Sequence, residues 1–236
     1  MQHWRRQSAL VEARLIVETL ADHLPTRFDG RQAIIDMKNS ESRQWRQMEW
    51  IAFYVEHLAE PVLNVTLGGR SGPQIGNTRF DYQREFVWDL KAHPNQKANG
   101  KPNDESPLND ALAIRECASE YHGVGFVIVH GNAEFDDSGE FKLWHDDLKG
   151  SQSKYETERI RRGSWSRRRK TAFDITQIDA VFLSSTDEID QAVSDHWLRP
   201  FQTGMRNSDG TPRRMKYKMV TPLVPDWAIL ASAYPR

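Results

Sequence analysis

The sequence predicts an α/β protein, of the α+β type, in which helices flank a mixed central sheet. Apolar residues recur every three or four positions over 6–24 and again over 42–58, which is the period of an amphipathic helix. The segment 123–129 is nearly all apolar, and such a run is typical of a central strand covered on both faces. Helices and buried strand together favour a sheet with helical cover over an all-helical or all-strand protein.

Prolines indicate where the two helices end, and short strands are expected between the second helix and the apolar segment 123–129. Pro25 ends the first helix and Pro61 ends the second, so that 62–67 is expected as a short strand. Two further strands, 77–82 and 85–91, are separated by so few residues that they should form an antiparallel hairpin. The first half of the chain therefore contains a helix followed by three strands.

A third helix is expected next, starting at Pro107 and running to about Tyr121 with Ser106 as its N-cap. With the apolar strand that follows, the order becomes helix, three strands, helix and strand. The second half is less regular, with a strand near 180–183 and a helix near 186–198.

Composition favours one soluble domain covering residues 1–236. The chain is 38% hydrophobic with eight Trp and ten Phe, enough for a core, and its net charge is -1. Its single cysteine, Cys117, forms no internal disulfide, and no secretory leader is visible, which predicts a reducing cytoplasm. No run approaches the roughly 20 apolar residues of a membrane span, so no membrane association is expected.

The candidate functional side chains lie on and next to the predicted strand 85–91. Its side chains alternate, so Asp89 and Lys91 lie side by side on the face opposite the apolar residues Phe86, Trp88 and Leu90. Asp81 precedes Asp89 by eight residues and is expected to reach back across the hairpin. Two acids and a lysine should therefore meet at one place.

Such a group of residues suits phosphodiester hydrolysis. Asp81 and Asp89 are the expected Mg²⁺ ligands, with the carbonyl of Leu90 as a third, because Mg²⁺ prefers oxygen ligands. Lys91 would orient or deprotonate the attacking water and offset charge on the scissile phosphate. The alternative is an ordinary exposed hairpin, since an Asp-x-Lys triplet is common.

The residues and the element order resemble the PD-(D/E)xK nuclease superfamily, which includes most type II restriction endonucleases. The resemblance covers 42–130, with Asp81 as the first acid and Asp89 and Lys91 as the second acid and the lysine. Phe80 stands where the name-giving pattern has proline. The resemblance implies a restriction-endonuclease-like fold, Mg²⁺ as cofactor, and a homodimer that reads a palindromic site and cuts both strands.

The same resemblance implies a glutamate from the first core helix. Glu49 and Glu56 are both candidates because they lie seven residues apart on one helix face. We favour Glu49 over Glu56. The alternative is that both side chains are solvated.

Double-stranded DNA is the expected partner of the second half of the chain, about 150–218. Eight Lys or Arg and two Glu lie between Lys154 and Lys170. Phosphate contacts are expected from this run, and Trp165 could stack on a base or anchor the segment in the core. The residues proposed for DNA binding are Arg159, Arg161, Arg162, Trp165, Arg167, Arg168, Arg169 and Lys170. A second, weaker basic stretch covers 206–218.

The leading hypothesis is therefore a Mg²⁺-dependent, sequence-specific endonuclease for double-stranded DNA, of the type II restriction class. A repair or junction-resolving nuclease of the same fold is the first alternative. The second alternative is a non-catalytic nucleic-acid-binding protein.

Overall fold

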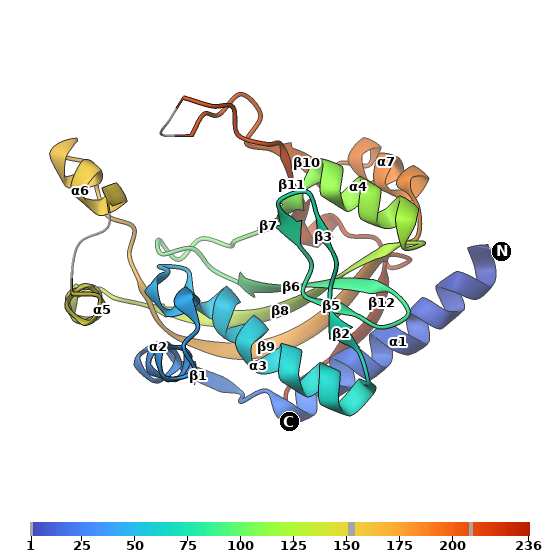
Figure 1. Ribbon diagram of the computed structural model, residues 1–236, viewed down its shortest axis with the longest axis horizontal. Helices are drawn as coiled ribbons and strands as arrows, with labels where there is room; N and C mark the ends of the chain where they lie inside the picture. Colours follow the sequence, from blue (N-terminus) through green and yellow to red (C-terminus); the bar gives the residue numbers. More distant parts are fainter. Residues whose placement is uncertain (1, 151–153, 208–209) are drawn as a thin grey trace.

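The computed structural model describes residues 2–150, 154–207 and 210–236, and a curled mixed sheet lies at its centre (Figure 1). This sheet has seven strands in the order β1-β9-β8-β6-β5-β2, with β12 pairing on β9. Its members are β1 (Arg27–Asp29), β2 (Arg70–Ser71), β5 (Tyr82–Gln83), β6 (Val87–Pro94), β8 (Val124–Phe135), β9 (Lys170–Leu183) and β12 (Ile229–Ala233).

The middle of the sheet is mixed. Strands β6 and β8 run parallel, with Val87 opposite Val124 and Pro94 opposite Gly131. Strand β5 is antiparallel to β6, and β9 is antiparallel to β8. Apolar side chains cover β6 on both faces, so the strand is buried rather than half exposed.

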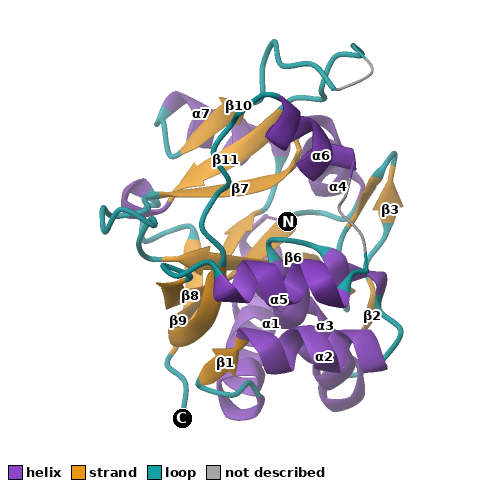
Figure 2. Ribbon diagram, turned by 90° about the vertical axis from the view of Figure 1, so that its left-hand side faces the viewer, coloured by secondary structure: helices purple, strands orange, loops and turns teal. Residues whose placement is uncertain are grey.

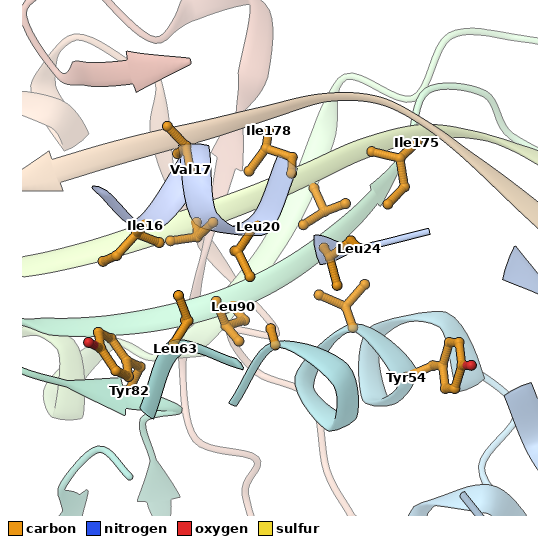
Figure 3. Packing of buried hydrophobic residues seen from close by; sticks show 14 of the residues in the cluster. Ile16, Val17, Leu20, Leu24, Tyr54, Leu63, Tyr82, Leu90, Ile175 and Ile178 are labelled. Atoms are coloured by element: carbon orange, nitrogen blue, oxygen red, sulfur yellow. The ribbon is translucent and has the colours of Figure 1, made fainter. Parts of the chain in front are cut away.

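Helices from the first part of the chain cover one face of the sheet (Figure 1). They are α1 (Gln2–His23), α2 (Gly30–Asn39), the short 3-10 helix η1 (Arg43–Arg46) and α3 (Trp50–Leu67), joined by α5 (Glu140–Leu148). Figure 3 shows this packing, in which Leu90 of β6 lies among Leu63 of α3 and Leu20 of α1. This layer holds β6 from the Leu90 side.

A second layer covers the other face. A three-stranded antiparallel sheet, in the order β10-β11-β7, packs there with two helices (Figure 2). Its elements are β7 (Glu105–Asp110), α4 (Ala111–Glu120), α7 (Thr186–Ser194), β10 (Leu198–Phe201), β11 (Lys216–Val220) and the 3-10 helix η2 (Thr221–Leu223). The short pair β3 (Gln74–Ile75) and β4 (Thr78–Arg79) and the helix α6 (Lys154–Arg161) complete the chain.

The mixed sheet with helical cover confirms the α+β prediction, but the expected strand 62–67 is wrong. Helix α3 passes through Pro61 and ends at Leu67, where Gly68 takes a left-handed conformation with φ of 73°. The buried face formed by Val55, Ala59 and Leu63 continues across the proline. This packing outweighs the one hydrogen bond that proline removes.

The expected helix start at Pro107 is also wrong. Ser106 and Pro107 lie in β7, and α4 begins only after Asp110, whose side chain accepts hydrogen bonds from two backbone N–H groups of the first turn. Strand β7 exists because it pairs with β11, more than a hundred residues further along the chain. Local sequence contains no sign of that pairing.

No helix in the described ranges is both long and apolar enough to span a membrane. The prediction of a single domain over 1–236 stays a prediction. Parts of the proposed DNA-contacting segment, residues 151–153 and 208–209, lie outside the described residues.

Candidate metal centre

The β5–β6 hairpin brings Asp81 to Asp89. Tyr82 pairs with Trp88 and Gln83 with Val87, so the register continued by one residue places Asp81 opposite Asp89. The carboxylate of Asp81 accepts a hydrogen bond of 2.6 Å from the backbone N–H of Leu90. The two acids and the lysine are thus neighbours, as the spacing predicts.

Two buried aromatic side chains fix the backbone at Asp81. Phe80 and Tyr82 are both fully buried, but Phe80 lies in the core beside α4 and Tyr82 lies in the core beside α3. Phe80 and Tyr82 are buried on opposite faces of the sheet, and they hold Asp81 at the bend between β4 and β5. The phenylalanine in place of proline therefore has a structural role of its own.

Asp89 is buried, with 1% of its surface exposed. Its Oδ1 accepts a hydrogen bond of 2.8 Å from Nδ2 of Asn109, which lies on β7. Its Oδ2 accepts no hydrogen bond of good geometry from the described residues and instead forms an ion pair with the ammonium of Lys91. The sequence does not indicate Asn109, because the segment that contains it has the pattern of a helix and not of a strand.

The Lys91 ammonium also donates to the carbonyl of Leu90 at 3.2 Å. Burial alone would lower the pKa of Lys91, but the surrounding carboxylates of Asp89, Asp81 and Glu56 outweigh it and raise that pKa. Lys91 is consequently a persistent cation in the metal-free protein.

Glu56, not Glu49, lies with these residues. The pKa of Glu56 is raised to about 7, chiefly by burial and also by Asp89 and Glu60, while Lys91 opposes the rise. Glu49 sits at the N-cap of α3, half exposed, and pairs with Lys170 at 2.5 Å. The preference for Glu49 is therefore corrected: α3 contributes the glutamate about two turns further on, because Glu49 is the N-cap before Trp50 and pairs with Lys170.

Negative charge is in excess at this place. The pKa of Asp81 is raised to about 9, chiefly by burial and also by the nearby Asp89 and Glu56, while Lys91 and the Leu90 N–H oppose the rise. Asp81, Asp89 and Glu56 are thus three buried or half-buried carboxyl groups that share a single ammonium. A bound cation would relieve their repulsion, and in its absence protons do so.

The donor set fits Mg²⁺. Asp81, Asp89 and the Leu90 carbonyl offer oxygen atoms, with neither thiol nor imidazole among them. In the described part of the chain, no three His, Cys, Asp or Glu side chains are gathered tightly enough to enclose an ion by themselves. Mg²⁺ does not require such a cage, because it is commonly held by one or two carboxylates and retains several waters.

No family model, curated protein or solved structure matches this chain. Function is therefore inferred from its residues and their geometry.

The basic run does not form one continuous free surface. Several of its arginines pair with acids: Arg159 with Glu156, Arg161 and Arg162 with Glu158, and Arg168 with Asp137. Lys170 pairs with Glu49, and Arg169 is buried with 7% of its side chain exposed. Arg167 is exposed, and Trp165 is 98% exposed, so Trp165 does not anchor the segment in the core.

Proposed function

We propose that this chain is a Mg²⁺-dependent endonuclease that hydrolyses phosphodiester bonds in double-stranded DNA, as a type II restriction enzyme. The supporting observation is the meeting of Asp81, Asp89 and Lys91 in one buried place with an excess of negative charge. An ordinary exposed hairpin would leave these side chains in water. Burial of like charges is costly, and such arrangements cluster at functional sites.

Each residue has a chemical role in this proposal. Asp81, Asp89 and the Leu90 carbonyl would hold Mg²⁺, which when bound offsets phosphoryl charge and makes water more acidic. Lys91, kept protonated by its acidic neighbours, offsets charge on the scissile phosphate rather than acting as a base. Asn109 holds the Asp89 carboxylate in one orientation by its hydrogen bond.

The element order supports a restriction-endonuclease-like fold. Helix α3, strands β2, β5 and β6, helix α4 and strand β8 follow one another in the order that the resemblance requires. The site lies on β5 and β6, and β6 pairs in parallel with β8. The insertions β3–β4 and β7 interrupt this series without changing its order.

In this proposal, duplex DNA contacts basic side chains from the second half of the chain. Helix α6 and the β10–β11 pair project on the side of the sheet away from the C-terminus (Figure 1). The basic residues 206–218 lead into β11 and include Arg214, which is 3.9 Å from Asp110, next in the chain to Asn109. A homodimer would place two such sites on the two strands of a palindrome.

The test is cleavage of plasmid and linear duplex DNA by the purified chain with Mg²⁺ or with EDTA. Asp89→Asn and Lys91→Ala should lower the rate by at least about 100-fold, because several kcal/mol of charge stabilisation is lost. Asp226→Asn, which alters an exposed aspartate, is the matched control and should cleave normally.

The products distinguish the related functions. Discrete fragments from linear DNA support a restriction enzyme, whereas cleavage only at branched or damaged DNA points to a repair or junction-resolving nuclease. Salt-sensitive DNA binding without cleavage in Mg²⁺ or Mn²⁺ contradicts the proposal and leaves a nucleic-acid-binding protein. Cutting at full rate by both site variants removes the site assignment.

A further inference from the structure

A cavity of about 510 Å³ lies between η1, α5, α6 and the segment leading into β9. Six cationic side chains line it, against the two acids Asp146 and Glu156. The cations are Arg43, Arg46, Lys149, Arg159, Arg167 and Arg169. None of the lining residues belongs to the metal centre, so this is a separate feature of the molecule.

The two acids of the cavity are already occupied. Asp146 pairs with Lys142 at 2.9 Å and with Lys149 at 3.3 Å. Glu156 pairs with Arg159 at 2.7 Å and with Lys142 at 3.2 Å, and these partners lower its pKa to about 2. The acids therefore stay ionised and have little charge left for the other cations.

Positive charge remains uncompensated in the cavity. Within the described residues, no acidic side chain pairs with Arg43, Arg46 or Arg167. Burial lowers the pKa of Lys149 despite the opposing effect of Asp146, and the neighbouring cations Arg169 and Arg46 contribute in the same direction as burial. Cations that crowd one another to this degree favour an anion between them.

Arg169 is the strongest sign of a missing partner. Its side chain is 7% exposed, and its Nε is buried with no hydrogen-bond partner among the described residues. The nearest acid is Asp146, 3.9 Å from Nη2, which is beyond hydrogen-bond distance. A buried guanidinium with an unsatisfied N–H is costly unless a ligand completes its bonds.

The cavity wall is also held in place. Arg46 donates to the carbonyl of Lys149 at 3.0 Å, and its guanidinium lies 5.0 Å from the ring centroid of Trp45. These contacts fix η1 against the end of α5. The Arg46 guanidinium, held in this way, is pre-organised for an oxyanion.

We propose that this cavity binds a phosphate group. Several guanidinium groups and one ammonium can surround the oxygens of a tetrahedral phosphate with charge-assisted hydrogen bonds, from more directions than a planar carboxylate would use. The phosphate can come from the backbone of duplex DNA, which rests on the proposed function, or from free phosphate or a phosphomonoester, which does not.

Inorganic phosphate is the probe for the cavity itself. Calorimetric titration of the full chain, at constant ionic strength set with chloride, should show saturable binding. The double variant Arg43→Ala/Arg46→Ala should weaken binding by about tenfold or more, because two charge-assisted contacts are lost. Both residues are exposed on η1, and circular dichroism checks that the variant folds. Because Arg46 also holds η1 against α5, the single variant Arg43→Ala, which keeps that contact, should weaken binding as well.

Arg161→Ala is the matched control, because this arginine is on α6 but pairs with Glu158 outside the cavity. It should bind phosphate like the unaltered chain. If all four proteins bind phosphate equally, or if none binds it, the proposal is overturned.

Measurements of duplex DNA binding distinguish the DNA backbone from free phosphate or a phosphomonoester as the ligand of the cavity. In an Asp89→Asn background, fluorescence anisotropy is measured over a range of salt. If the double variant reduces the magnitude of the slope of log K against log salt by about one, as expected for the loss of one phosphate contact, the DNA backbone occupies the cavity. If it loses phosphate binding while DNA binding is unchanged, free phosphate or a phosphomonoester is the ligand. Cleavage by the unaltered chain is scored separately, so failure of the nuclease proposal leaves this one standing.

Discussion

The carboxylate of Asp81 accepts a hydrogen bond of 2.6 Å from the backbone N–H of Leu90, the residue between Asp89 and Lys91. This bond spans the β5–β6 hairpin and ties the first acid to the strand that holds the second. It exists because Tyr82 pairs with Trp88, which aligns the two chains. The hairpin register is therefore what creates the candidate metal centre.

Neutralising Asp81 should stabilise the metal-free protein at neutral pH. The unfolded chain loses this proton near pH 3.8, whereas burial keeps it on in the folded state to about pH 9. Folding is thus penalised above pH 4, and the penalty is absent below it. Asp81→Asn keeps an acceptor for the Leu90 N–H and should raise the melting temperature in EDTA at pH 7.5.

The gain from Asp81→Asn should disappear as the pH falls below about 4, where the native aspartate is protonated in both states. Asp226→Asn, at an exposed position, should change the melting temperature little at either pH. A lower melting temperature for Asp81→Asn at pH 7.5 would contradict the described electrostatics.

The two helix glutamates should behave differently. Glu56→Gln removes a carboxyl group from the metal centre and should slow cleavage by about tenfold or more while raising the Mg²⁺ concentration for half-maximal rate. Glu49→Gln breaks only a half-exposed pair with Lys170, which contributes less than about 1 kcal/mol. Metal titrations of both variants give the comparison, and a larger effect at Glu49 would reverse our assignment.

Asn109 should matter as a positioning residue. Asn109→Ala frees Oδ1 of Asp89 and is expected to weaken Mg²⁺ affinity or activity by about 10-fold to 100-fold, as such supporting contacts usually do. Asn99→Ala, in an exposed loop, serves as the control. Unchanged Mg²⁺ dependence in Asn109→Ala would show that the Asp89 carboxylate needs no such support.

Glu12 of α1 should contribute strongly to stability because it holds the start of β6. It is buried and accepts hydrogen bonds from the backbone N–H groups of Glu85 and Phe86 and from Nε1 of Trp88. Glu12→Ala leaves these donors buried without partners, at a cost of about 3 kcal/mol or more.

Urea denaturation measures that cost. Glu12→Gln retains one acceptor oxygen and should lose less stability than Glu12→Ala. Glu18→Ala, at an exposed position of the same helix, should stay within about 0.5 kcal/mol of the unaltered chain. If Glu12→Ala and Glu18→Ala lower the free energy of unfolding equally, Glu12 does not hold the start of β6.

Sequence patterns predicted the parts of the site that depend on local structure. The alternation from Phe86 to Lys91 and the apolar run of β8 both match the observed strands, because period and burial are local properties. Even so, β6 is covered on both faces, and the acidic face of Asp89 was expected to lie opposite the core. The second layer that covers it comes from segments distant in sequence.

The remaining features depend on long-range contacts. Asn109 reaches Asp89 only because β7 pairs with β11, and the sequence around Pro107 favours a helix start instead. Glu49 and Glu56 are equivalent in a helical pattern until the first residue of α3 is known. The phosphate cavity combines η1, α5 and α6, which no single window of sequence contains.

Diffraction from crystals soaked in Mn²⁺, recorded at its absorption edge, can show whether a divalent cation binds between Asp81 and Asp89. Mn²⁺ takes the same oxygen ligands as Mg²⁺ and can be located by its anomalous signal. We expect an anomalous peak in contact with carboxylate oxygens of Asp81 and Asp89. Separation of these two side chains onto different surfaces, with no ion between them at saturating Mn²⁺, would contradict this expectation.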